Sequence, residues 1–221
     1  MPSKKPTFTT MYFIRHGQTP TTGIELPGRK PGLHLSELGI KQAALLGEAL
    51  AKNKSLKSAP VFVSPLERTR ETAAPIAKAL RTRVKVEKGL IECDFGDYTG
   101  RKLADLAKLD GWRAMHLSAS TWRFPNGESF LEMQLRVSQT IWKLSESHLG
   151  KSVIVVSHAD PIKMALNSAL GSSIDFFHRI EVGPASVSIV RYMQLGPSAV
   201  PQVIGVNLDS GSSFVRGSSH G

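Results

Sequence analysis

Short apolar runs alternate along the chain with longer segments in which apolar residues recur every three or four positions. The longer segments predict helices at 36–50, 65–80, 129–148 and 161–170. The short runs predict strands at 11–14, 61–63, 84–86, 153–156 and 186–192. Strands that alternate with helices favour a parallel sheet. We therefore expect an α/β fold, a three-layer α/β/α sandwich around a mostly parallel central sheet.

Arginine and histidine side chains follow three of the predicted strands. Arg15 and His16 come directly after the first run, Arg68 comes shortly after the second, and His158 follows the run at 153–156. Arg15 and His16 alone would fit an ordinary basic strand end. In open parallel sheets, however, ligands bind outside the carboxyl ends of the strands, so all four side chains are expected at one place. Two guanidinium groups and two imidazoles there indicate a phosphate site.

The segment around Arg68 carries the signals of a helix start. Ser64 suits an N-cap, Pro65 suits the first helical position, and Glu67 stands three residues after Ser64, as in a capping box. This reading predicts that the helix begins directly after the strand at 61–63. Arg68 is then expected in its first turn, close to the strand end.

Five motifs occur in an order that resembles the histidine phosphatase superfamily, which includes cofactor-dependent phosphoglycerate mutases and many small phosphatases. The motifs are RHGQT at 15–19, LSELGIKQA at 35–43, SPLERTRETA at 64–73, IECDFGDYTG at 91–100 and VVSHAD at 155–160. The resemblance covers nearly the whole chain. It implies a phosphoglycerate mutase-like fold and metal-independent hydrolysis of a phosphomonoester, as in a histidine acid-type phosphatase.

The resemblance also implies roles for individual residues. His16 would be the nucleophile that becomes a phosphohistidine, and Glu92 would be the proton donor. From the residues alone, Asp94 competes with Glu92, because both carboxylates are equally near the turn. Many family members carry Asn six residues after the first histidine, where this chain has Thr22, whose hydroxyl can also bond to phosphate. The residues expected to bind substrate are Arg15, Gly17, Thr19, Thr22, Arg68, His158 and the backbone of Ala159.

A metal site is the chemical rival for this set of side chains, because histidine and carboxylate ligands suit zinc and iron. The sequence has no HxH or HExxH pattern around these residues, and two arginines would oppose a bound cation. We therefore expect neither a metal nor another cofactor. The candidate ligands under the metal hypothesis are His16, Glu92, Asp94, His158 and Asp160.

Two other functions remain open from the sequence. A phosphoglycerate mutase would use the same site, but only 66 positions separate Glu92 from His158, and the mutases resembling this family usually carry a longer insertion there. A noncatalytic module that binds phosphoproteins or polyanions would need neither His16 nor Glu92. The expected partner is a small phosphorylated metabolite, and Arg29 and Lys30 could contact a second anionic group or form a solvated turn. No particular oligomeric state is favoured.

Length and composition add limits to this picture. The 221 residues suit one domain over 1–209, with 103–127 as a lid or insertion and the Gly/Ser-rich stretch 210–221 as a tail. No run approaches about 18 apolar residues, and residues 1–6 lack the apolar part of a signal peptide. With a single cysteine, Cys93, this predicts a cytoplasmic protein without a membrane partner. The net charge of +10 is dispersed, so no specific nucleic-acid partner is expected.

Overall fold

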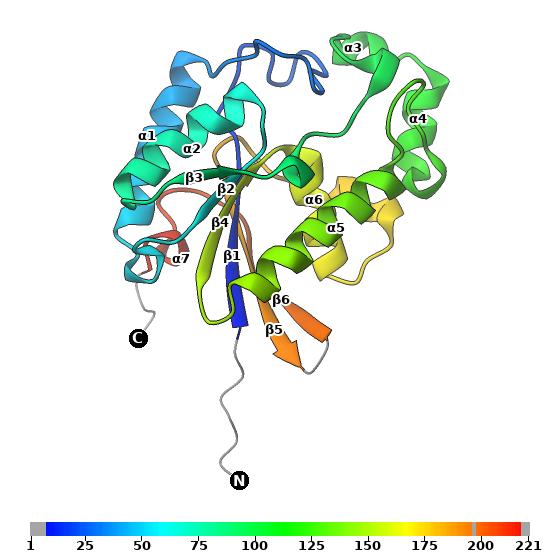
Figure 1. Ribbon diagram of the computed structural model, residues 1–221. Coiled ribbons are helices and arrows are strands. Elements are labelled where there is room, and N and C mark those ends of the chain that lie inside the picture. The colour runs from blue at the N-terminus through cyan, green and yellow to red at the C-terminus, as the bar shows by residue number, and fades with distance from the viewer. Residues whose placement is uncertain (1–7, 196–197, 218–221) are drawn as a thin grey trace.

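A single six-stranded sheet forms the centre of the protein (Figure 1). The computed structural model describes residues 8–195 and 198–217. The strand order is β3-β2-β4-β1-β5-β6, and β1, β2, β3 and β4 pair in parallel. β5 is antiparallel to both β1 and β6. The strands are β1 (Phe8–Arg15), β2 (Val61–Val63), β3 (Val84–Val86), β4 (Ser152–Ser157), β5 (Val187–Leu195) and β6 (Ser198–Leu208).

The register of the central strands brings their ends together. β1 pairs with β4 so that Arg15 lies opposite Ser157. His16 and His158 are the next residues on the two strands, and both therefore leave the sheet at the same level. β2 is the other neighbour of β4, with Val63 opposite Val156, so the segment after β2 leaves the sheet beside them.

Helices cover both faces of the sheet. Helices α1 (Glu37–Ala51) and α2 (Glu67–Ala79) lie on one face, and α5 (Phe130–Ser147) and α6 (Ala159–Ala169) lie on the other (Figure 1). The pleat of β1 separates the two cores: Tyr12 and Ile14 pack with α1 and α2, whereas Met11 and Phe13 pack with α5 and α6. This arrangement confirms the predicted α/β class with its mostly parallel sheet.

The start of α2 differs from the prediction. The helix begins at Glu67, with Leu66 at the N-cap position and no side-chain cap. Ser64 does not cap it, because its hydroxyl oxygen lies 2.7 Å from Nε2 of His158. Arg68 nevertheless lies in the first turn, as expected.

Two other segments form helices in addition to the four helices placed by the apolar periodicity. Residues 103–127 contain two short helices, α3 (Leu103–Leu106) and α4 (Asp110–Leu117), at the end of the molecule where β1 ends (Figure 1). Their role as a lid stays a prediction. Within the stretch expected to be a tail, Ser213–Arg216 form α7, and Val215 is fully buried, because it packs in the core beneath α1. Residues 218–221 of that stretch lie outside the described part.

Short 3-10 helices make up much of the remaining connecting chain. Two of them lie next to segments with candidate residues. η2 leads from β3 into the acid segment at 91–100, and η5 follows α6. They are η1 (Lys54–Leu56), η2 (Lys88–Leu90), η3 (Gly96–Tyr98), η4 (Ala119–Thr121) and η5 (Ile174–Arg179).

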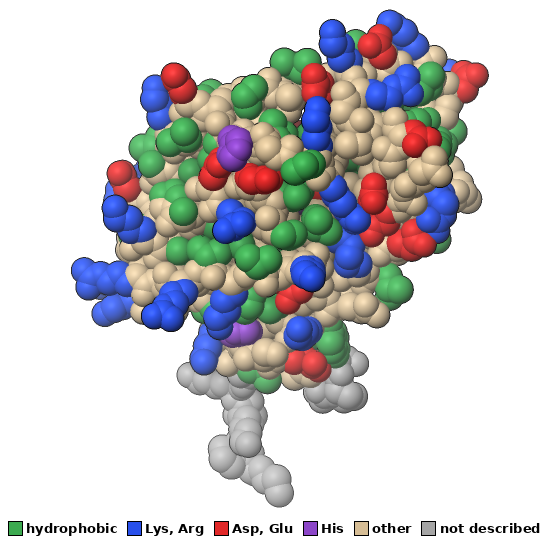
Figure 2. Space-filling view, turned by 45° about the horizontal axis from the view of Figure 1, so that its top comes forward, with side chains coloured by type: hydrophobic (Ala, Val, Ile, Leu, Met, Phe, Trp, Pro, Cys, Tyr) green, Lys and Arg blue, Asp and Glu red, His purple; other side chains and the backbone are tan. Residues whose placement is uncertain are grey.

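One face of the molecule carries its charge in dispersed form. On the face that Figure 2 shows, Lys and Arg side chains lie in several separate groups, with acidic, hydrophobic and neutral side chains between them. Among the helices described for residues 8–195 and 198–217, none has the length and apolar character needed to cross a membrane.

Candidate active site

Three chain segments bring the predicted site residues together at the carboxyl end of the parallel strands. His16 follows β1, His158 follows β4, and Arg68 stands in the first turn of α2 after β2. The rings of His16 and His158 are 5.3 Å apart at an angle of 65°. His158 and Arg68 are fully buried, His16 is 5% exposed and Glu92 is 7% exposed. The cluster is therefore shielded from bulk water, which strengthens electrostatic interactions inside it.

The ring of His16 is held with one nitrogen available for chemistry. Nδ1 lies 2.8 Å from the carbonyl oxygen of Gly17, so it carries the proton and donates it to that oxygen. Nε2 is then unprotonated, and its lone pair accepts a hydrogen bond from Nε of Arg68 at 3.3 Å. Burial, followed by the charge of Arg68, lowers the pKa of His16 to about 3. The imidazole is therefore neutral near pH 7, as a nucleophile must be.

Three buried nitrogen atoms around His16 have no hydrogen-bond partner in the described chain: Nε of Arg15, Nη1 of Arg68 and Nδ1 of His158. Other atoms of the two arginines are anchored, since Nη1 of Arg15 donates to the Val182 carbonyl at 2.7 Å and Nη2 of Arg68 donates to the Gly28 carbonyl at 2.8 Å. Buried donors are normally satisfied. Unsatisfied donors that converge beside a neutral imidazole suit a bound oxyanion.

The geometry distinguishes the two carboxylates that the residues alone left open. Glu92 lies in the cluster, with Oε2 4.0 Å from Nδ1 of His158 and with Oε1 accepting the N–H of Cys93 at 2.9 Å. Asp94 is 42% exposed in its side chain and pairs with Arg29 at 3.4 Å. Of the two, Glu92 lies beside His158 in the buried cluster, whereas Asp94 is more exposed and is paired with Arg29.

The environment of Glu92 suits a proton donor. Burial and, after it, the charge of Asp160 raise its pKa to about 7, although Arg68 opposes the rise. Burial also lowers the pKa of His158 far below its usual range, so this imidazole is neutral. When Glu92 is protonated, both neighbouring groups therefore carry no charge. Burial likewise lowers the pKa of Arg15 and Arg68, but a guanidinium stays charged in proteins.

Several residues expected to bind phosphate bond to protein groups. The N–H of Gly17 donates to the Thr72 hydroxyl at 3.0 Å. A side chain at Gly17 is excluded, because a Cβ atom there would lie 2.6 Å from the Gly39 carbonyl oxygen. The Thr19 N–H donates to the Thr22 hydroxyl at 2.9 Å, and the two hydroxyls are 3.0 Å apart. Direct roles for these residues in substrate binding stay predictions.

The expected backbone donor of Ala159 stands at the first residue of α6, directly after His158. The first N–H groups of a helix have no acceptor within the helix. Its contact with substrate also stays a prediction. Cys93 is fully buried, and burial raises its pKa well above the usual value, which makes the thiol a poor nucleophile.

A dipeptide that the sequence did not mark as structural links the two sides of the cluster. The Gly28 carbonyl accepts from Arg68, and Nε of Arg29 donates to the Glu92 carbonyl at 2.8 Å. Gly28 has a φ of +53°, and a Cβ atom there would lie 2.8 Å from the Thr99 hydroxyl. Arg29, expected either to contact a second anion or to be solvated, is instead bound to protein groups.

The described residues contain no group of three or more His, Cys, Asp or Glu side chains arranged to hold a metal ion. The candidate ligands are instead divided between two settings. His16, His158 and Glu92 lie beside the buried Arg68 and the half-buried Arg15, whereas Asp94 is paired with Arg29. The expectation of metal-independent chemistry is kept as a prediction with its own test.

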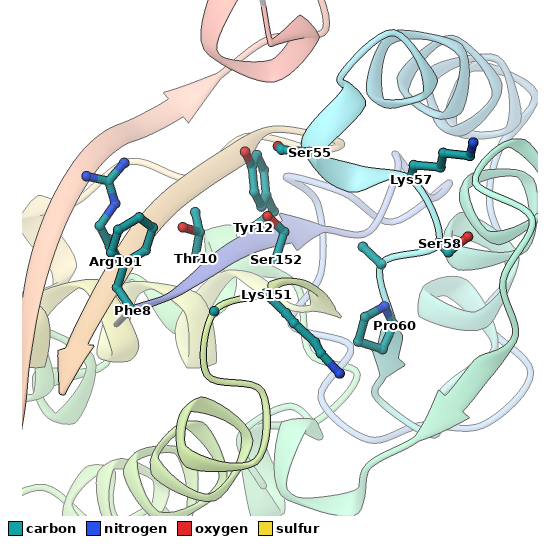
Figure 3. A pocket seen from close by; sticks show the side chains of 12 residues that line it. Phe8, Thr10, Tyr12, Ser55, Lys57, Ser58, Pro60, Lys151, Ser152 and Arg191 are labelled. Atoms are coloured by element: carbon teal, nitrogen blue, oxygen red, sulfur yellow. The ribbon is translucent and has the colours of Figure 1, made fainter. Parts of the chain in front are cut away.

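A hollow of about 540 Å³ lies at the opposite end of the sheet, where β1 and β4 begin (Figure 3). It contains none of the predicted site residues. Its lining is polar and aromatic, and Figure 3 shows Tyr12 and Ser152 in its middle, between Arg191 and Lys57. The cluster around His16 is thus separate from this hollow.

The sequence and the fold are similar to those of known proteins. The sequence profile of the histidine phosphatase superfamily (branch 1) matches residues 11–202. The chain is 33% identical over 195 residues to Bifunctional protein Rv2228c of Mycobacterium tuberculosis, which is 87% of this chain and 52% of that protein. It therefore spans about half the length of this relative. Phosphoserine phosphatase 1 of Hydrogenobacter thermophilus is 29% identical over 186 residues, or 82% of this chain and 85% of that protein.

The solved structures include similar folds over nearly the whole chain. The native structure of the mycobacterial glucosyl-3-phosphoglycerate phosphatase Rv2419c superposes with a TM-score of 0.81 at 25% identity, covering 91% of this chain and 100% of that one. This likeness confirms the predicted phosphoglycerate mutase-like fold. The profile match covers most of the chain and includes all the motifs that carried the resemblance. The chain belongs to the histidine phosphatase superfamily.

Proposed function

We propose that the protein hydrolyses phosphomonoesters through a phosphohistidine on His16, without a metal ion. The observation that carries this proposal is the state of the His16 ring. Its Nδ1 is bonded to the Gly17 carbonyl, which leaves the Nε2 lone pair beside three buried donors without protein partners. A phosphoryl group bound to those donors would stand within reach of Nε2.

The first half of the reaction transfers the phosphoryl group to the protein. Nε2 of His16 attacks phosphorus, and the bond from phosphorus to the ester oxygen breaks. Arg15, Arg68 and His158 hold the remaining phosphoryl oxygens, which need positive charge and hydrogen bonds more than other assistance. Glu92, protonated because its pKa is about 7, gives its proton to the leaving oxygen.

The second half returns the protein to its starting state. The Glu92 carboxylate removes a proton from water as the water oxygen attacks phosphorus. The bond from phosphorus to Nε2 breaks, inorganic phosphate forms, and Glu92 is protonated again. Splitting one displacement into two steps is the general advantage of a covalent nucleophile.

A phosphoglycerate mutase is the second candidate, because it would use the same groups and return the phosphoryl group to a substrate. The short span of 66 positions between Glu92 and His158 supports the phosphatase. The relatives named phosphoserine phosphatase and glucosyl-3-phosphoglycerate phosphatase support a small phosphorylated metabolite as substrate class. A cytoplasmic location and the lack of a specific nucleic-acid partner stay predictions.

Trapping the intermediate tests this proposal. The protein is mixed briefly with a ³²P-labelled phosphomonoester and quenched without acid. We expect a protein-bound label that survives alkali and is lost in acid, as a phosphoramidate is, and that is missing from His16→Ala. A label on the His16→Ala protein, or one stable to acid, would exclude the phosphohistidine. Phosphate binding without turnover would favour a noncatalytic binding module.

A further inference from the structure

The main chain that carries Glu92 is held by side chains from distant parts of the sequence. Four successive carbonyl groups, from residue 89 to residue 92, each accept a hydrogen bond from a side chain. This segment begins in η2, and residues 91 and 92 lie between η2 and η3, outside regular secondary structure. The donors are Arg136 Nη1 to Gly89 (2.9 Å) and Ile91 (2.8 Å), Ser157 Oγ to Leu90 (2.7 Å), and Arg29 Nε to Glu92 (2.8 Å).

Glu128 joins the two arginines of this set. Its carboxylate accepts two bonds from Arg136, at 3.0 and 2.8 Å, and one from Arg29 at 3.0 Å. It also accepts the N–H of Asp94 at 3.3 Å, and the Glu128 N–H donates to the Asp94 carbonyl at 2.9 Å. The Glu128 side chain is only 12% exposed. A planar guanidinium can make several bonds of fixed direction, so the three side chains hold the segment at defined points.

The direction of the Glu92 carboxyl group depends on this main chain. Oε1 accepts the N–H of Cys93, the next residue in the same segment. The other oxygen, Oε2, is the one nearest His158. A change in the backbone at residues 91–93 would therefore turn the carboxyl group away from His158, even with Glu92 itself unchanged.

We propose that Arg29, Glu128 and Arg136 are positioning residues for Glu92. They hold the acid segment so that its carboxyl group faces the leaving oxygen, and they do not touch the reacting atoms. The inference rests on the proposed role of Glu92 as proton donor. Two groups of side chains then have different tasks. Arg15, Arg68 and His158 bind the phosphoryl group, whereas the three positioning residues orient the carboxyl group that gives the proton.

Kinetics with two substrates can distinguish whether these residues position Glu92 or only stabilise the fold. An alkyl leaving group needs the proton of Glu92, whereas nitrophenolate leaves almost without it. A misplaced Glu92 should therefore lower kcat/KM for propyl phosphate far more than for p-nitrophenyl phosphate. A protein that is merely less stable would lose activity on both substrates to the same extent.

The test uses conservative variants and a matched control on the same helix. Arg136→Lys and Glu128→Gln weaken the hold on the acid segment, and Arg29→Lys does so from a more exposed loop. The control is Glu132→Gln, which breaks the exposed ion pair with Arg123 near the start of α5 and does not contact the acid segment. Thermal unfolding of each variant is measured beside both kcat/KM values.

We expect Arg136→Lys and Glu128→Gln to raise the ratio of the two kcat/KM values, nitrophenyl over propyl phosphate, by about 10-fold or more, and Glu132→Gln to leave it unchanged. Equal losses on both substrates would overturn the inference. If Arg136→Lys does not fold, Arg29→Lys and Glu128→Gln carry the test.

A double variant separates this inference from the proposed role of Glu92. In a Glu92→Gln background, Arg136→Lys should no longer change the substrate ratio, because residues that act through one another are not additive. A further change in that background would contradict positioning through Glu92. If Glu92→Gln alone does not change the ratio, the role of Glu92 itself is wrong. If Glu92→Gln changes it but none of the three positioning variants does, only the further inference fails.

Discussion

The hydroxyl oxygen of Ser64 lies 2.7 Å from Nε2 of His158, and both residues are buried. A hydroxyl that donates to Nε2 places the imidazole proton on Nδ1, the nitrogen that faces Glu92 and the cluster. His158 can then donate to a bound phosphoryl oxygen while remaining neutral. We therefore infer that the Ser64 hydroxyl donates to Nε2 and so sets which tautomer of His158 the site contains.

Replacing Ser64 should therefore reduce activity through His158. We expect Ser64→Ala to lower kcat/KM by roughly 10-fold to 100-fold, since the imidazole can then carry its proton on the wrong nitrogen. Ser145→Ala, which removes another buried hydroxyl, serves as the control and should change kcat/KM little. ¹⁵N NMR of the unmodified protein should show the proton on Nδ1 of His158; a proton on Nε2 would contradict this account.

The raised pKa of Glu92 predicts a pH profile. The proton donor must be protonated, so kcat/KM for propyl phosphate should fall as pH rises through about 7. The charge of Asp160 contributes to the raised pKa, so Asp160→Asn should move this fall to lower pH. Ionisation of the substrate is the same for both proteins, and the difference between their profiles reports Glu92. Identical profiles would argue against Glu92 as the titrating group.

Arg68 makes a prediction about charge and geometry. Arg68→Lys keeps the positive charge but loses the fork that contacts both His16 and the Gly28 carbonyl. We expect a loss in kcat of about 100-fold or more, as for removal of other transition-state donors. Activity of the unmodified protein should persist after chelation and dialysis. Loss of activity with chelator that zinc or manganese restores would contradict the metal-independent mechanism.

The neutral state of buried His16 predicts acid sensitivity. Its folded pKa of about 3 lies below the usual 6.5, so the unfolded chain binds a proton that the folded chain does not. Stability is therefore lost as pH falls from 6.5 toward 3. When pH falls from 7 to 5, the free energy of unfolding should decrease in both proteins. The decrease should be about 2 kcal/mol smaller for His16→Asn than for the unmodified protein.

Urea unfolding at both pH values measures that difference. Glu92 acts in the opposite direction, because its folded pKa of about 7 exceeds the usual 4.5 and adds stability as pH falls through about 7. Both the unmodified protein and His16→Asn contain Glu92, so its contribution to the pH dependence largely cancels when the two proteins are compared. Equal losses for both proteins would show that His16 is not held neutral by the fold.

The choice between phosphatase and mutase depends on whether water reaches the phosphohistidine. A mutase must exclude water and retain its product, which requires a closing lid. We expect phosphate release from several phosphomonoesters and at most trace interconversion of phosphoglycerates when bisphosphoglycerate is supplied. Interconversion about tenfold faster than phosphate release would favour the mutase and leave the roles of His16 and Glu92 unchanged.

The strand ends could be predicted from the sequence because their signal is local. Apolar runs mark β1 and β4, and parallel pairing then brings His16 and His158 together whatever the rest of the chain does. β6 could not be predicted in the same way. It contains Pro201 and Gly205, which weaken a strand pattern, and is tolerated because Pro201 lies on an edge strand.

The contacts around the site could not be read from local pattern. Glu92 and Asp94 are only two residues apart in the sequence, but their surroundings differ. Arg29, from another loop, pairs with Asp94. Ser64 carries every local signal of an N-cap, but a contact with His158, 94 residues away, uses its hydroxyl instead. Local preference is a weak guide where tertiary contacts compete for the same polar atom.

The link that Gly28 and Arg29 form between Arg68 and Glu92 has a consequence for engineering. The loop after β1 borders the site and is a natural region to exchange when a different specificity is wanted. An exchange that replaced residues 28 and 29 would disturb both Arg68 and the main chain of Glu92 at once. Grafts that vary residues 23–26 while keeping this dipeptide should instead change which substrate is preferred without loss of the chemistry itself.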